Sequence, residues 1–165
     1  MKLGTMLVVV AVLVALVPGV TSAGGAFDRE TLSGLKGVAV VVEPPVKTLE
    51  LQRLPAETLQ ADVEKRLRKS RIPILTVEKA EDPPGKPCLY VTVNAKTTSG
   101  DTMVYSIDVA LKQEVRLTRN GILLHGATTW STRTLGISDD TNRIRNALVS
   151  IVGSFCDDYE ATNPK

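Results

Sequence analysis

The chain of 165 residues carries few side chains that could perform catalysis. His125 is the only histidine, and it follows Leu124 near the end of an expected hairpin, where it would face Arg116. A nucleophilic triad needs a histidine beside a serine and a carboxylate, and this arrangement provides neither. We therefore expect His125 to be a surface residue and expect no catalytic residue in the chain.

The acidic residues show no spacing that is typical of a metal or glycosidase site. Asp139-Asp140 is typical of helix capping, and Asp157-Asp158 of a charged helix end. One histidine and two cysteines are too few for the usual metal clusters, and the chain contains no phosphate-binding glycine loop and no calcium-loop repeat. We expect no metal and no cofactor.

Cys88 and Cys156 are the only cysteines, an even number that fits an oxidising compartment. A bridge between them would stabilise the fold by about 4 kcal/mol through the entropy of the closed loop. The alternative is two buried free thiols, since cysteine packs well as a small apolar residue. We predict the disulfide Cys88–Cys156.

Residues 1–23 have the order of a secretory signal peptide. Lys2 precedes the uncharged apolar run from Leu3 to Val17, Pro18-Gly19 follows, and cleavage fits best after Ala23. The alternative is an uncleaved anchor, but the run is shorter than the roughly 20 residues needed to cross a bilayer. We expect an exported protein, periplasmic or extracellular, with one domain over residues 24–165 and no stable membrane insertion after cleavage.

The net charge is +2 and falls to +1 when Lys2 is removed with the signal. Such a balance gives no electrostatic support to nucleic-acid binding. We expect no nucleic-acid partner.

A long hairpin is the clearest pattern in the chain. Apolar and polar residues alternate from Met103 to Arg119, and Asn120-Gly121 is a strong signal for a two-residue turn. This turn places Leu111 beside Trp130, Val109 beside Thr132 and Asp108 beside Arg133. Alternation and turn geometry agree on this register.

The remaining segments predict one α+β domain. Strands are expected over residues 37–42, 74–77 and 89–94, one helix begins at Pro55, and a final helix of about 22 residues is capped by Ser138 or Asp139. Residues 23–34 are expected to be a loose terminus. The order β-α-β-β-β-β-α, with one apolar stripe on each helix, predicts a two-layer sandwich. Its sheet is mostly antiparallel, and both helices lie on one face.

The chain resembles an uncharacterised family of small exported bacterial proteins with no assigned function. The resemblance rests on three stretches: Leu59–Arg68, Tyr105–Gln113 and Tyr159–Lys165. It implies a protein of the bacterial envelope and no active site. The element order is also similar to envelope domains of the TolB amino-terminal type, which is a likeness of fold alone.

These features favour a non-enzymatic interaction or assembly module that acts through the long hairpin. Its expected partner is an envelope protein or a second copy of the chain, and the expected contact residues are apolar and close to the turn: Leu117, Ile122, Leu123 and Leu124. In a structural alternative, residues 46–54 pack over the tip.

Two other functions stay open. One is a periplasmic carrier that holds a small ligand between helices and sheet. The other is a hydrolase with a site on the polar sheet face, where Asp108, Arg133, Lys112 and Thr129 are expected.

Overall fold

The structure, a computed structural model, describes residues 26–45, 54–76, 85–98, 100 and 102–164. The predicted signal peptide and residues 46–53 lie outside this part of the chain. The elements follow the order α1 (Ala26–Glu30), β1 (Val38–Val42), α3 (Ala56–Lys69), β2 (Ile74–Leu75), β3 (Cys88–Thr97), β4 (Met103–Arg116), β5 (Leu123–Ser138) and α4 (Thr141–Thr162).

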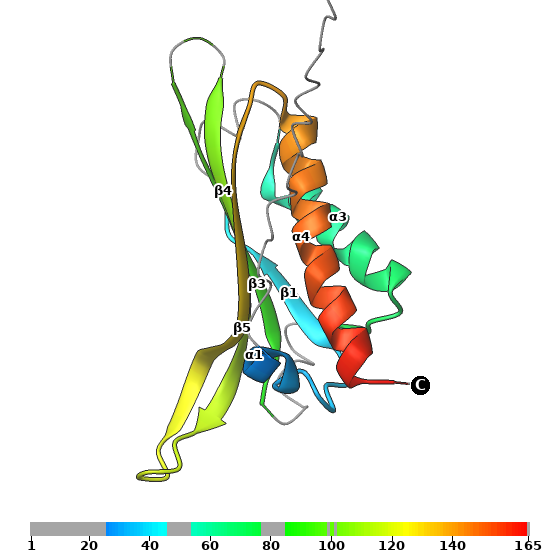
Figure 1. Cartoon of the computed structure of the whole chain (residues 1–165), viewed down its shortest axis with the longest axis vertical. Coiled ribbons are helices and arrows are strands. Elements are labelled where there is room, and N and C mark those ends of the chain that lie inside the picture. Colours follow the sequence, from blue (N-terminus) through cyan, green and yellow to red (C-terminus); the bar gives the residue numbers. More distant parts are fainter. Residues whose placement is uncertain (1–25, 46–53, 77–84, 99, 101, 165) are drawn as a thin grey trace, which may run out of the picture.

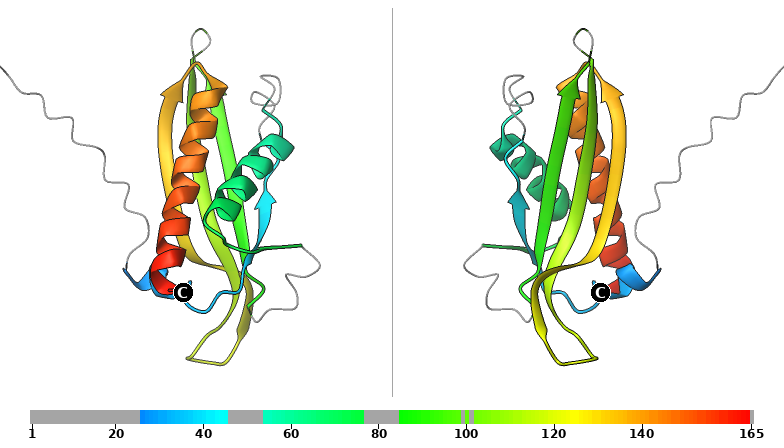
Figure 2. Two further views of the ribbon diagram at one scale, coloured as in Figure 1. Left: turned by 90° about the vertical axis from the view of Figure 1, so that its right-hand side faces the viewer. Right: turned by 90° about the vertical axis from the view of Figure 1, so that its left-hand side faces the viewer.

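Five strands form one sheet in the order β2-β1-β3-β4-β5. β1 is parallel to both β2 and β3, and β3, β4 and β5 are antiparallel neighbours. Figure 2 shows α3 and α4 on the same face of this sheet. The predicted α+β sandwich, with its crossover and its antiparallel meander, is confirmed.

The two long helices bury the stripes that their sequences predict. Leu59, Val63 and Leu67 of α3 are fully buried, because their spacing places them on one face of the helix. On α4 the buried stripe contains Ile144, Leu148, Ile151, Val152 and Phe155. The helices are also joined at their polar margins, where the Arg145 guanidinium donates to both oxygens of Asp62 at 2.7 and 2.9 Å.

The cap of α4 differs by one or two residues from the prediction. Asp140 is the N-cap residue, and its side chain accepts a hydrogen bond from the backbone N–H of Asn142 at 2.8 Å. Ser138 instead exchanges hydrogen bonds with the backbone of Asp140. Both polar residues thus fix the start of the helix, and Asp139 does not cap it.

The predicted hairpin register is confirmed over its inner half. Leu111 pairs with Trp130, Val109 with Thr132 and Asp108 with Arg133. Beyond Leu111 the register shifts twice, so that Arg116 pairs with Leu123.

The predicted two-residue turn at Asn120-Gly121 is therefore wrong. Leu117 donates its backbone N–H to the carbonyl of Ile122 at 2.9 Å, and residues 118–121 form a four-residue loop. The two bulges increase the local twist and bend of the strands, which a regular hairpin pattern does not predict. Figure 1 shows this outer part of the hairpin leaning away from the helices.

The expected loose terminus contains an ordered helix. α1 has only five residues, and it is fixed to α4 by the ion pair between Arg29 and Asp158, whose atoms lie 2.7 Å apart. Asp158 is buried, and it also accepts a hydrogen bond from the indole N–H of Trp130. Asp158 is therefore a core residue and not part of a charged helix end, whereas its neighbour Asp157 is exposed.

The predicted disulfide is wrong, because Cys88 and Cys156 are both free. Along β3, Leu89, Val91 and Val93 are buried toward the helices, so the alternation of the strand turns Cys88 to the opposite face. Cys156 is buried on α4, in the helical layer. The sheet therefore separates the two sulfur atoms, which a disulfide cannot span. Burial raises the pKa of both thiols.

No helix in the described ranges is long and apolar enough to cross a membrane.

Candidate functional site

The end of the hairpin exposes a run of large apolar side chains. Ile122, Leu123 and Leu124 are 52, 42 and 40% exposed, and Leu117 across the loop is half-buried. We call these four residues the tip surface. Figure 1 shows the tip extending past α1 and past the ends of the long helices. The structure thus brings together all four predicted contact residues at one projecting end of the molecule.

A second apolar group lies on the sheet face that the helices do not cover. Leu135 and Ile137 on β5 are 72 and 70% exposed, and Val104 on β4 is 41% exposed. Val104 pairs directly with Ile137, and Leu135 pairs with Ser106 in the next position. We call these three apolar residues the face patch. The sequence analysis missed it, although the correct inner register already places Val104 beside Ile137.

The tip surface and the face patch lie on the same two strands, β4 and β5. Figure 1 shows that this pair of strands bends toward its uncovered side at both ends. The largest exposed apolar side chains of the described chain are all found here. Exposed apolar groups of this kind mark contact surfaces more often than catalytic sites.

The base of the tip is held by an ionic cluster at the second bulge. Glu114 Oε1 lies 2.6 Å from His125 Nδ1 and 3.5 Å from Lys86 Nζ. The hydrogen bond with His125, assisted by the positive charge of Lys86, lowers the pKa of Glu114 below its ordinary value. His125 is exposed as predicted, but it contacts Glu114 and does not face Arg116.

The first bulge lies where Thr129 is inserted between paired residues. Its carbonyl accepts a hydrogen bond from the Thr31 hydroxyl at 3.1 Å, and its own hydroxyl accepts one from the Gln113 side chain at 2.7 Å. The turn after α1 therefore covers the outer edge of β5 at this point. The positions of both bulges depend on contacts with Thr31 and Lys86, which are distant in the sequence.

The four residues considered for a hydrolase do not converge. Asp108 accepts a hydrogen bond from Arg133 Nε, and a cavity of about 460 Å³ lies beside this pair. Lys112 instead stacks over the Tyr90 ring, with its Nζ 3.7 Å from the ring centroid. Thr129 is occupied by the contacts of the bulge. The arrangement provides an ordinary cross-strand ion pair and no activated nucleophile.

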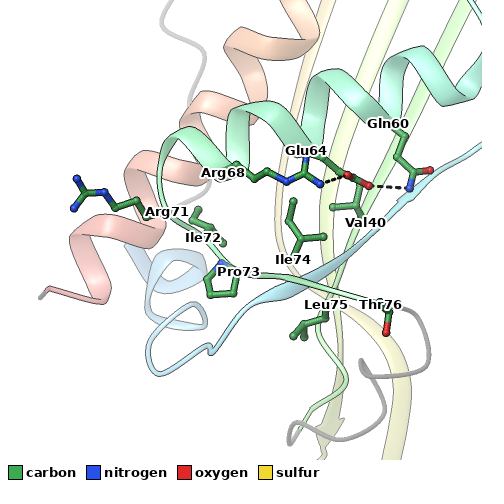
Figure 3. A pocket seen from close by; sticks show the side chains of 10 residues that line it. All are labelled: Val40, Gln60, Glu64, Arg68, Arg71, Ile72, Pro73, Ile74, Leu75 and Thr76. Carbon is green, nitrogen blue, oxygen red and sulfur yellow. Dashed lines mark hydrogen bonds and ion pairs between the residues drawn. The ribbon is translucent and has the colours of Figure 1, made fainter.

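A larger cavity of about 610 Å³ lies between α3 and β2, at the opposite edge of the sheet (Figure 3). One wall is formed by Gln60, Glu64 and Arg68, which follow each other along α3. Gln60 donates to Glu64 Oε1 at 3.1 Å, and Arg68 donates to Glu64 Oε2 at 2.6 Å. The other wall is the chain from Ile72 to Thr76. We call this cavity the α3–β2 groove.

Within the described residues, no group of three or more histidine, cysteine, aspartate or glutamate side chains could hold a metal ion.

Comparisons with known proteins leave the function open. No family model matches the chain, and no curated protein matches it. A solved structure of a PelC dodecamer from Paraburkholderia phytofirmans is similar, with 15% sequence identity and a TM-score of 0.45. The likeness covers 75% of this chain and 92% of the PelC chain. At this level of similarity it carries no argument about function, and the resemblances to an exported bacterial family and to TolB-type domains stay predictions.

Proposed function

We propose that the protein is an exported, non-enzymatic interaction module of the bacterial envelope, which binds a protein partner through the tip surface. The signal-like residues 1–23 support export. The observation that carries the proposal is the exposure of three consecutive apolar residues, Ile122, Leu123 and Leu124, on a projecting hairpin. The partner is a second copy of the chain or another envelope protein.

The energetics favour a contact surface over a free tip. Burying one such side chain in an interface stabilises it by roughly 1.5–3 kcal/mol when burial is complete. The adjoining cluster of Glu114, His125 and Lys86 restrains the base of the hairpin. A restrained hairpin loses less conformational freedom on binding, so more of the burial energy contributes to affinity.

The substitution Leu123→Asp tests this function. Because Leu123 is 42% exposed and outside the core, the variant should fold and melt like the parent. It should lose the association of the parent, measured by size-exclusion chromatography with light scattering, alone and with envelope extract. Lys65→Asp on the exposed face of α3 is the control. A large fall in the melting temperature of Leu123→Asp alone would instead show that the tip belongs to the folded core.

A second candidate function is favoured by the α3–β2 groove. A carrier needs a cavity between helix and sheet, and this one lies in the volume range of small-molecule sites. Its walls come from two elements that the hairpin does not touch. The two functions can therefore be tested separately.

A further inference from the structure

We propose that the α3–β2 groove binds an extended acidic peptide, which adds as a strand to the outer edge of β2. This site is independent of the tip surface, since it lies at the other edge of the sheet. The proposal rests on the backbone of β2, on the charges of the groove and on the conformation of Arg71.

The backbone of β2 offers a free pairing edge. Val38 of β1 is in register with Ile74 and donates its N–H to the carbonyl of Pro73 at 3.0 Å. In a parallel pair this arrangement turns the N–H and C=O of Ile74 away from β1. Among the described residues no strand lies beyond β2, so this donor and this acceptor face outward. They are the groups with which an added strand pairs.

The groove is lined for alternating side chains. Its apolar part contains Val40, Ile72 and Ile74, and its volume of about 610 Å³ has room for several residues of a peptide. Figure 3 shows Ile74 pointing toward the α3 wall and Leu75 pointing away from it. A peptide in extended form would therefore place every second side chain against α3 and the apolar part of the groove.

The charges of the groove favour an acidic occupant. Arg68 and Arg71 supply two guanidinium groups, against the single carboxylate of Glu64. Both oxygens of Glu64 already accept hydrogen bonds, from Gln60 and Arg68, so Glu64 does not attract a basic ligand strongly. Arg68 is 63% exposed and forms one ion pair, which leaves other N–H donors for a ligand carboxylate.

Arg71 lies at the end of the groove in a backbone conformation that arginine rarely adopts. Its φ is 58°, and it follows the C-cap of α3, where glycine is the favoured residue. The Ile72 N–H donates to the Leu67 carbonyl across it at 3.0 Å, which completes the helix end. An arginine held in this conformation costs stability, as is common at functional sites. Glycine would satisfy the fold better, so Arg71 is best explained by what its side chain binds.

The experiment uses the full exported chain and a fluorescent pentapeptide of sequence Thr-Val-Glu-Val-Thr with blocked ends. Binding is followed by fluorescence anisotropy, and the site is mapped by amide NMR shifts. We expect the largest shifts at Ile74 and Leu75. A peptide with N-methylated valines should bind about tenfold more weakly, because it loses backbone hydrogen bonds. A peptide with lysine in place of glutamate should also bind about tenfold more weakly.

The variants Arg71→Gly and Arg68→Gln separate binding from folding. Arg71→Gly should melt at the same temperature as the parent or higher, and it should bind the acidic peptide several-fold more weakly. Arg71→Lys, which keeps both the charge and the strain, should retain binding. No shift at Ile74 with the peptide at millimolar concentration would overturn the proposal. So would affinities that are equal for the acidic, basic and N-methylated peptides. Shifts at Ile74 that depend on protein concentration without peptide would assign the edge to a second copy and overturn it as well.

Discussion

Trp130 and Asp158 join the sheet to the last helix through one buried hydrogen bond, in which the indole N–H donates to Asp158 Oδ2 at 2.9 Å. The second oxygen of Asp158 pairs with Arg29 of α1. The Trp130 ring also packs edge-on against Phe155, with ring centroids 5.2 Å apart. One carboxylate thus connects α1, β5 and α4, at the level of the first hairpin bulge.

We therefore expect Asp158→Ala to destabilise the protein by about 2–3 kcal/mol, because it leaves the buried Trp130 N–H without a partner and Arg29 without its ion pair. Chemical denaturation followed by tryptophan fluorescence measures this change. The adjacent Asp157→Ala is the matched control, since the Asp157 side chain is 78% exposed and should contribute almost nothing. Equal effects of the two substitutions would contradict the buried role of Asp158.

The two cysteines should remain thiols. Without reductant, the denatured protein should react with a thiol reagent at both Cys88 and Cys156. In the native state Cys156 should react far more slowly, because it is fully buried and burial raises its pKa. Mass spectrometry of the alkylated protein identifies each site. Protection of both residues after denaturation would show that a bridge forms after all.

The carboxyl group of Glu114 should titrate below its ordinary range, because the hydrogen bond with His125 lowers its pKa. A folded-state pKa below the unfolded one means that the contact stabilises the hairpin fully above the unfolded pKa. This stabilisation is lost as pH falls through the folded pKa. Carboxyl NMR shifts measured against pH test this directly. In His125→Ala the pKa should rise toward its ordinary value but stay below it, since Lys86 remains; an unchanged pKa would assign the effect to Lys86 alone.

Gly136 should tolerate no side chain while Tyr105 is present. It pairs with Tyr105 across β4 and β5, and a Cβ at this position would overlap the Tyr105 ring. We expect Gly136→Ala to destabilise the protein by about 1–3 kcal/mol through overpacking. In a Tyr105→Ala background the same substitution should be nearly neutral. A double-mutant cycle measured by thermal denaturation gives the coupling, and additive effects would refute the steric explanation.

The sequence was sufficient for those parts of the fold in which a residue type repeats at a regular period. The register around Asp108 and Arg133 follows from alternation along the strands, and the buried stripe of α4 follows from helical spacing. The bulge at Thr129 could not be predicted in this way, because it depends on the hydrogen bond from Thr31, which lies far away in the sequence. Helix α1 is too short for a periodic signal and depends on the partner of Arg29.

The candidate sites divide along the same line. The tip surface was predicted because a hairpin and its apolar end are local features. The face patch was accessible from the register but was not considered. The α3–β2 groove could not be predicted, since it exists only where Ile74 on the edge strand approaches Glu64 and Arg68 on the helix. The disulfide was predicted from cysteine count alone, although the alternation around Leu89 already indicated the opposite face for Cys88.

The most direct test of the proposed function is site-specific photo-crosslinking of the exported chain in its native envelope, with the photoreactive residue at Leu123 and a control at Lys65. The proposal predicts one dominant crosslinked species at Leu123, identified by mass spectrometry as a second copy or a single envelope protein. That species should be absent at Lys65 and disappear when Leu124→Asp is added to the Leu123 probe. Equal labelling at Leu123 and Lys65, unaffected by Leu124→Asp, would contradict an interaction through the hairpin.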